Sequence, residues 1–129
     1  MKPVLGVVKI GTPMLLESPA LEGPCAVLFE DDGDTGYFYA VERTSAGPEM
    51  LDALHIYNAE QDLRGVECRL ELVWSSDGRK AGLRLNGTLW AAFDFEHEEG
   101  RCRSNFPPPG GRWQMAERPA WSDAVIRQF

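Results

Sequence analysis

Few side chains in this sequence could support chemistry, and most of them are carboxylates. The chain has 129 residues, with 20 Asp plus Glu, 13 Lys plus Arg and two histidines, His55 and His97. Two histidines offer little material for imidazole catalysis or for a multi-histidine metal site. The GxSxG, HExxH, P-loop and GxGxxG motifs are absent from the sequence. We therefore favour a protein without catalytic activity and predict no metal and no cofactor.

An acidic segment between two apolar runs is the first candidate for binding. The segment does not fit a calcium-binding loop, because Gly33 would occupy a ligand position. Its Asp and Gly residues are instead those that tight turns require. We interpret the segment as a hairpin turn that contacts another protein with a basic surface, with two tyrosines as aromatic anchors. The predicted contact residues are Glu30, Asp31, Asp32, Asp34, Tyr37 and Tyr39.

The charge distribution supports this interpretation. Residues 17–62 contain eleven acids and one base, whereas residues 100–118 contain four arginines and one acid. If the acids share one surface, they attract basic partners, and if they are scattered, they contribute only solubility. With a net charge of -7 the chain is an unlikely ligand for nucleic acid. The hypothesis is an immunity (antitoxin-like) protein that occludes a basic bacterial toxin.

A second hypothesis is a small-molecule-binding domain or modest enzyme. Polar residues embedded in apolar runs must be paired or functional when they are buried. The five residues that would surround such a pocket are Asp52, His55, Tyr57, Asn58 and Asp94. A structural histidine that ties a helix to a sheet is the simpler interpretation of His55.

The elements that position these residues are clearest between residues 66 and 95. Apolar and polar residues alternate from Val66 to Trp74, as in a half-buried strand, and Asp77-Gly78 favours a two-residue type I′ turn. That turn would place Glu71 opposite Arg84. After Asn86-Gly87 the pattern is ambiguous: either the next strand is covered on both faces, or a bulged turn leaves Trp90 outside. We favour a buried Trp90.

The remaining segments complete an α+β fold. Residues 26–29 and 37–41 flank the acidic turn as a second hairpin, and residues 4–10 fit an outer strand. Residues 48–58 fit a short amphipathic helix, with a strand from Leu54 as the alternative. Ser122 is a suitable N-cap for a short C-terminal helix. We expect one domain over 1–129, with a mainly antiparallel sheet of five or six strands, one crossing helix and the terminal helix.

The cysteines and the hydropathy of the sequence indicate the cellular location that we expect for the protein. Three cysteines, Cys25, Cys68 and Cys102, match neither a disulfide framework nor a metal-binding spacing, so we expect reduced thiols. No apolar run reaches the length of a membrane span or of a signal-peptide core. A cytoplasmic protein is expected. A homo-oligomer that uses an open sheet edge or Trp90 is a third hypothesis.

Four strings together resemble a family of short bacterial proteins of unknown function. They are FEDDGDTGYFYA (29–40), LDALHIYN (51–58), KAGL (80–83) with AFDF (92–95), and CRSNFP (102–107). The resemblance covers about residues 25 to 109. It implies a bacterial single-domain protein, and it implies no established activity.

Overall fold

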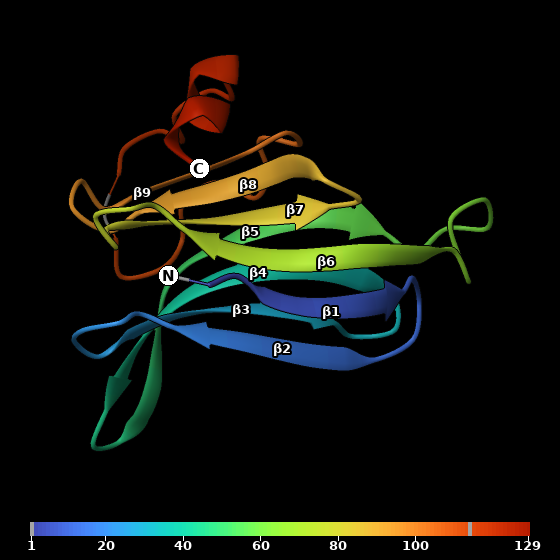
Figure 1. The fold of residues 1–129 in the computed structure, drawn as a ribbon, viewed down its shortest axis with the longest axis horizontal. Coiled ribbons are helices and arrows are strands. Elements are labelled where there is room, and N and C mark those ends of the chain that lie inside the picture. The colour runs from blue at the N-terminus through green and yellow to red at the C-terminus, as the bar shows by residue number, and fades with distance from the viewer. Residues whose placement is uncertain (1, 114) are drawn as a thin grey trace.

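The fold consists of two antiparallel sheets in a computed structural model that describes residues 2–113 and 115–129 (Figure 1). The first sheet, sheet A, has the strand order β1-β6-β7-β8-β9, and the second, sheet B, has the order β2-β3-β4-β5. The strands are β1 (Val4–Lys9), β2 (Met14–Pro19), β3 (Cys25–Asp31), β4 (Thr35–Thr44), β5 (Gly47–Asn58), β6 (Glu67–Trp74), β7 (Lys80–Leu85), β8 (Thr88–Asp94) and β9 (Glu99–Cys102).

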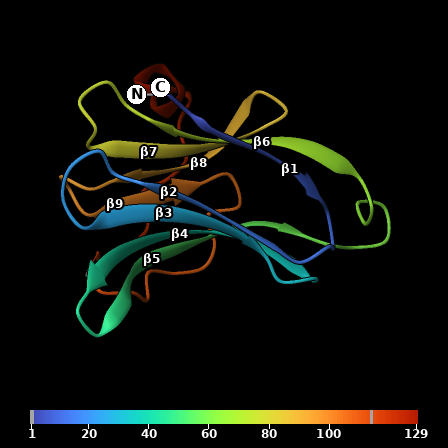
Figure 2. The same cartoon turned by 60° about the horizontal axis from the view of Figure 1, so that its bottom comes forward.

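The two sheets stack face to face as layers and share one apolar core (Figure 2). Phe38 from sheet B contacts Phe93 from sheet A with a ring-centroid distance of 4.9 Å, and both side chains are buried. The Trp74 indole donates a hydrogen bond of 3.0 Å to Ser18 Oγ, which also joins the sheets. The cysteines are free thiols, as predicted. This arrangement is a β-sandwich, so the expected single sheet with a crossing helix is wrong.

The predicted helix at residues 48–58 is strand β5. Its apolar spacing fits a helix because two β-bulges break the period of two that a regular strand shows. The bulges add Leu51 and Ile56 without a partner on β4, where the register shifts between Ala40 and Val41 and between Gly36 and Tyr37. A strand beginning at Leu54, the alternative interpretation, was correct in type and too short.

The register predicted for the β6–β7 hairpin is confirmed. Glu71 lies opposite Arg84, and the two side chains are 3.7 Å apart across the sheet. The turn type was wrong, because Gly78 has a positive φ and Asp77 does not. A type I′ turn needs positive φ at both central residues. The register is nevertheless as predicted, because the loop is still centred on Asp77 and Gly78, and Ser75 N donates to Lys80 O across it.

The β7–β8 connection resolves the conflict at Trp90. Asn86 and Gly87 both have positive φ, so this turn has two residues, and a bulge then shifts the register after Leu83. The bulge returns Phe93 to the core, while Leu89 is buried on the opposite face of sheet A. Trp90 is half-buried and packs against the core. Both faces of the strand are therefore covered, as one of the two alternatives proposed.

The two lateral edges of the sandwich differ. At one edge the described residues of 103–113 and 115–121 follow β9 past β5, and backbone bonds from His55 N to Phe106 O and from Trp113 N to Leu51 O attach them to β5. We call these residues the strap. At the other edge β1 and β2 are the outermost strands of their sheets. The strap therefore closes one edge and leaves the other open.

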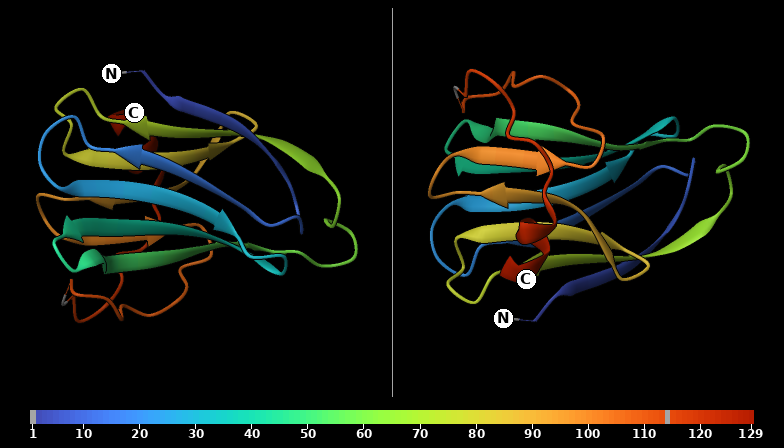
Figure 3. Two further views of the ribbon diagram at one scale, coloured as in Figure 1. Left: turned by 90° about the horizontal axis from the view of Figure 1, so that it is seen from below. Right: turned by 90° about the horizontal axis from the view of Figure 1, so that it is seen from above.

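The C-terminal helix is a 3₁₀ helix, Asp123–Gln128, capped as predicted by Ser122, whose Oγ accepts a bond from Ala124 N. It lies over the outer face of sheet A, where Val125 packs on Leu89 and Ala92 (Figure 3, right). No element of the described residues covers the outer face of sheet B (Figure 3, left). Within the described residues, none of the helical segments has the length and apolar character needed to cross a membrane.

Candidate functional site

The uncovered outer face of sheet B carries a row of side chains that crosses all four strands. Strand pairing aligns Leu15 on β2, Glu30 on β3, Tyr37 on β4 and His55 on β5. The backbone bond from His55 N to Phe106 O extends the row onto the strap. Since neighbouring residues in a strand point to opposite faces, these side chains point outward while their neighbours form the core. We call these five residues the sheet B row.

Aromatic contacts order this surface. The rings of Tyr37 and Tyr39 stack at 5.7 Å with an interplanar angle of 15°. His55 contacts Tyr37 edge-on at 6.1 Å and Phe106 edge-on at 5.9 Å. Phe106 is 53% exposed, and the two tyrosines and His55 are half-buried. Aromatic side chains held in this way present a large apolar area with little conformational freedom left to lose.

Glu30 supplies the negative charge within the row. Its Oε1 accepts a hydrogen bond of 3.0 Å from the Tyr39 hydroxyl. Burial and this bond to Glu30 raise the pKa of Tyr39, so the hydroxyl stays protonated and donates to the carboxylate. No Lys or Arg in the described ranges forms an ion pair with Glu30. Its charge is therefore available to a partner.

Asp31 has an internal role that conflicts with its predicted contact function. Its side chain is 1% exposed and accepts bonds of 2.8 Å from Gly11 N, 2.8 Å from Gly33 N and 2.6 Å from the Tyr57 hydroxyl. Burial and the bond to Asp31 raise the pKa of Tyr57. The carboxylate joins the β1–β2 turn to the acidic turn, and it is shielded from any partner.

Asp32 and Asp34 are exposed, as their predicted role requires. Asp32 Oδ1 accepts bonds from Asp34 N and Thr35 N, and these backbone bonds lower the pKa of Asp32. Asp34 lies 3.5 Å from Arg64 of the β5–β6 loop. The two aspartates thus lie at the end of sheet B, beside the sheet B row, and Asp34 has a cationic neighbour there.

Many of the acids between residues 17 and 62 are paired with arginines instead of forming one surface. Glu17 pairs with Arg43, and Arg112 of the strap pairs with both Glu42 and Glu49. The arginine-rich stretch therefore neutralises part of the acidic stretch across the fold. The unpaired acidic surface is therefore smaller than the sequence suggests, and Glu30 and Asp32 are the part of it that lies on or beside the sheet B row.

Asp52, a residue of the predicted pocket, forms a buried ion pair. Arg118 of the strap donates to both carboxylate oxygens at 2.8 and 2.9 Å, and both side chains are 2% exposed. The same guanidinium donates to Gly100 O and Pro107 O. The Arg118 guanidinium uses its N–H groups in these bonds. The ion pair therefore anchors the strap to the sandwich and leaves no reactive side-chain group free.

The other residues of the predicted pocket point to separate places. His55 Nε2 lies 2.9 Å from Asn58 Oδ1 on the outer face of sheet B. Tyr57 bonds to Asp31 in the interior. Asp94 ends β8 in the other sheet and lines a small cavity that does not include His55. The five residues therefore do not surround a common pocket.

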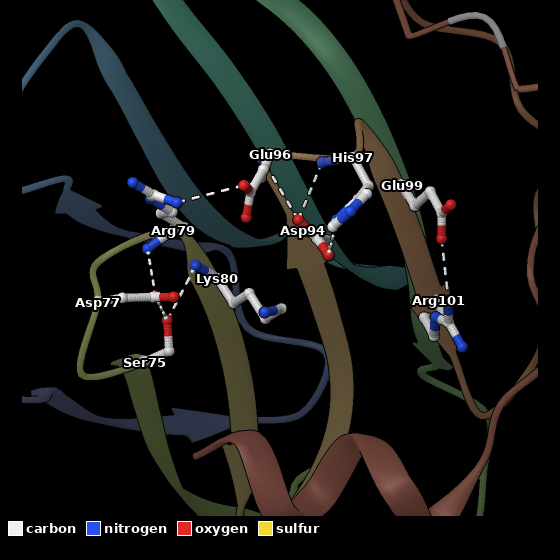
Figure 4. Close-up of polar contacts among 9 residues, drawn as sticks. All are labelled: Ser75, Asp77, Arg79, Lys80, Asp94, Glu96, His97, Glu99 and Arg101. Atoms are coloured by element: carbon white, nitrogen blue, oxygen red, sulfur yellow. Dashed lines mark hydrogen bonds and ion pairs between the residues drawn. The ribbon is translucent and has the colours of Figure 1, made fainter.

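Asp94 instead organises a polar turn between β8 and β9 (Figure 4). Its Oδ1 accepts bonds from the backbone N of Glu96 and of His97, and its Oδ2 lies 2.8 Å from His97 Nδ1. The bond to Asp94 raises the pKa of His97. Burial raises the pKa of Asp94, but the backbone and imidazole of His97 together bring it below its usual value. The pair is an exposed turn cap.

The surroundings of this turn argue against a reaction centre. Four of its charged neighbours are paired with one another, Arg79 with Glu96 at 3.2 Å and Arg101 with Glu99 at 3.0 Å (Figure 4). The adjacent cavity holds about 110 Å³, whereas ligand sites begin at roughly 300 Å³. Across residues 2–113 and 115–129 no group of three or more His, Cys, Asp or Glu side chains is arranged to hold a metal ion.

Sequence reasoning missed two contributions of the strap. Phe106 joins the sheet B row although 51 positions separate it from His55, and the Asp52–Arg118 pair spans 66 positions. The one signal in the sequence for a special role of Asp52 is that this charged residue stands inside an apolar run. No local pattern indicates its partner, because the pairing depends on where the strap returns to β5.

The comparisons with known proteins agree with the resemblance seen in the sequence. Residues 8–129 match a family model described as an uncharacterized protein conserved in bacteria (DUF2251). An uncharacterized protein of Haemophilus influenzae is 41% identical over 85 residues, which are 65% of this chain and 53% of the relative. The chain thus spans about half the length of this curated relative. No solved structure matches. The chain belongs to the DUF2251 family of uncharacterized proteins conserved in bacteria.

Proposed function

We propose that this chain is a non-catalytic binding domain that engages a basic protein through the outer face of sheet B. One observation carries the proposal: the uncovered sheet B row combines half-exposed aromatic rings with the carboxylate of Glu30, which forms no ion pair within the described residues. Interfaces commonly use such aromatic anchors, surrounded by polar groups that set orientation. An immunity protein that occludes a basic toxin is one member of this functional class.

The tyrosines and the carboxylates of this surface have different expected roles in binding. Tyr37 and Tyr39 stack on each other, which fixes their rotamers before a partner arrives. Glu30 and Asp32 add negative charge beside them, and opposite charge on a partner accelerates association. We therefore assign affinity chiefly to the tyrosines and association rate chiefly to the carboxylates. Asp31 has no place in this surface, because it is buried.

An affinity-capture experiment with matched variants tests the proposal. Wild-type protein, Tyr37→Ala and Leu5→Ala are immobilised and exposed to bacterial lysate, and the retained proteins are identified by mass spectrometry. Leu5 is 68% exposed at the opposite edge of the molecule, so its variant removes a surface side chain without touching sheet B. We expect a basic protein that wild type and Leu5→Ala retain and Tyr37→Ala loses.

The retained partner then allows a quantitative measurement. Loss of an anchor tyrosine is expected to weaken the Kd by about 30-fold, the equivalent of roughly 2 kcal/mol. Glu30→Gln should slow association and reduce its dependence on salt. A partner that binds wild type and Tyr37→Ala equally would contradict the proposal.

A further inference from the structure

A second surface feature lies at the end of the sandwich where β5 ends and β6 begins. The β5–β6 loop projects at this end (Figure 1), and a cavity of about 320 Å³ is lined by residues of that loop and of both sheets. Tyr57 and Ile56 line it from sheet B, and Trp90 and Leu85 line it from sheet A. Leu63 and Val66, each 43% exposed, form its mouth. The cavity lies inside the sandwich, whereas the sheet B row is on its outer face.

The chemistry of the lining is apolar and uncharged. Its side chains include no Asp, Glu, Lys, Arg or His. The Tyr57 hydroxyl donates to Asp31 at 2.6 Å and is therefore already used. The other polar groups are the buried thiol of Cys68, a weak donor, and the neutral side chains of Asn86 and Thr88, which are exposed at the β7–β8 turn. A charged ligand would lose hydration here without gaining an ionic partner from the lining.

We infer that this cavity binds a small neutral molecule with an apolar body and one hydrogen-bonding group, such as an alcohol or an amide. Its volume falls within the range of about 300–1,000 Å³ that small-molecule sites occupy. An apolar lining with a few polar groups at one side is the composition that such sites show. The apolar body of the ligand would lie between the sheets, and its polar group would face the β7–β8 turn.

Two side chains of the lining are held in place before a ligand arrives. The Arg103 guanidinium lies 5.5 Å from the centroid of the Trp90 ring, and Arg103 Nε donates to Leu89 O at 2.8 Å. These contacts restrict the indole, which becomes a rigid wall of the cavity. Asn86 Oδ1 accepts a bond of 2.8 Å from Arg69 N, which leaves the Asn86 amide N–H groups as donors. A preorganised site loses less entropy on binding.

Two-dimensional NMR of the full chain tests the inference with three probes of equal chain length: 1-octanol, octanoate and octylammonium. The readout is the indole N–H resonance of Trp90, assigned by comparison with Trp90→Phe. We expect 1-octanol to shift this resonance in a saturable manner. The two ionic probes should bind about tenfold more weakly or not at all, because the lining offers no charge to compensate theirs.

Variants at the mouth separate binding in the cavity from binding elsewhere. Val66→Phe and Leu63→Phe enlarge half-exposed side chains at the mouth, and each should weaken 1-octanol binding about tenfold. Val7→Phe is the control, because Val7 is 61% exposed on β1 and lies outside the lining. Thermal unfolding identifies any variant that does not fold, and the other mouth variant then decides. The inference is overturned if 1-octanol leaves the Trp90 resonance unmoved, if the ionic probes bind as well, or if the folded mouth variants bind like wild type.

Discussion

At the scale of single residues, Gly100 permits the buried ion pair of the strap. A Cβ at this position would overlap Asp52 Oδ2 and lie 2.9 Å from Phe93 Cε1. We therefore expect Gly100→Ala to lower the free energy of unfolding by about 3 kcal/mol, because it displaces one partner of a buried pair in a packed core. Gly110→Ala is the control, since its Cβ would meet nothing closer than 3.8 Å. Urea denaturation of both variants measures the difference, and equal midpoints would refute the explanation.

The Asp94–His97 pair predicts a defined pH dependence. The folded pKa of His97 is raised, so its contribution to stability is full below the ordinary His pKa and is lost as the pH rises through the folded value. The folded pKa of Asp94 is lowered, so its contribution is full above the ordinary Asp pKa and is lost as the pH falls through the folded value. The pair therefore stabilises the turn between these limits.

An NMR titration of the His97 ring checks this coupling. In Asp94→Asn the pKa of His97 should fall toward the value of a free histidine, because the largest cause of its shift is removed. Glu98→Gln serves as the control, since no bond joins Glu98 to the ring. An unchanged titration of His97 in Asp94→Asn would show that the carboxylate does not hold the imidazole.

At the scale of elements, the strap depends on Arg118. Replacing Arg118 by Met leaves the Asp52 carboxylate buried without its counter-ion, and we expect a loss of about 3–5 kcal/mol in unfolding free energy. The double variant Asp52→Leu with Arg118→Met removes both charges and should recover much of that loss. Chemical denaturation of the single and double variants gives the coupling. Additive effects would show that the two side chains do not act as a pair.

The two edges of the sandwich should differ in hydrogen exchange. His55 N donates to Phe106 O of the strap, so this amide of an edge strand is protected. At the end of β1, Ile10 N donates to Val66 O. Because successive amides of an antiparallel edge strand point alternately toward and away from the neighbouring strand, the amides of Leu5 and Val7 point away from β6. We predict slow exchange at His55 and fast exchange at Leu5 and Val7. Fast exchange at His55 would mean that the strap opens readily.

The sequence predicts individual elements well where one face is apolar and the other polar. The β6–β7 register was predicted from the position of the Asp77-Gly78 turn, it agrees with the apolar alternation, and it is confirmed. Residues 47–58 mislead, because the bulges at Leu51 and Ile56 change the apolar spacing that distinguishes a strand from a helix. Strand β9 was missed because Glu99–Cys102 is short and its inward Gly100 carries no apolar side chain to reveal the pattern.

At the scale of the whole molecule, charge in the sequence does not translate directly into charge on a surface. The strap carries Arg112 and Arg118 back to Glu42, Glu49 and Asp52, which lie more than 60 positions earlier. Composition reveals an acidic stretch and a basic stretch, but only the fold reveals that two arginines of the basic stretch neutralise part of the acidic one. Of the predicted contact residues, Asp31 alone is internal, and nothing in its local sequence separates it from Asp32.

Only part of the proposed surface could be predicted from the sequence. Tyr37 and Tyr39 were predicted as aromatic anchors, and they do lie on the outer face of one sheet beside Glu30. His55 was assigned to a pocket, yet strand pairing aligns it with Tyr37, and the strap adds Phe106. Long-range pairing of strands decides which residues share a face, and a single sequence does not encode that pairing locally.

Site-specific photo-cross-linking in bacterial cells tests whether the outer face of sheet B binds a basic protein. A photoreactive phenylalanine analogue replaces Tyr37 in one variant and Val7 in another, because both positions are on the surface but on different sheets. We expect a discrete cross-link to a basic protein from position 37, lost when Glu30→Gln and Tyr39→Ala are added, and none from position 7. A cross-link to the same protein from position 7 alone, or from both positions equally, would contradict it.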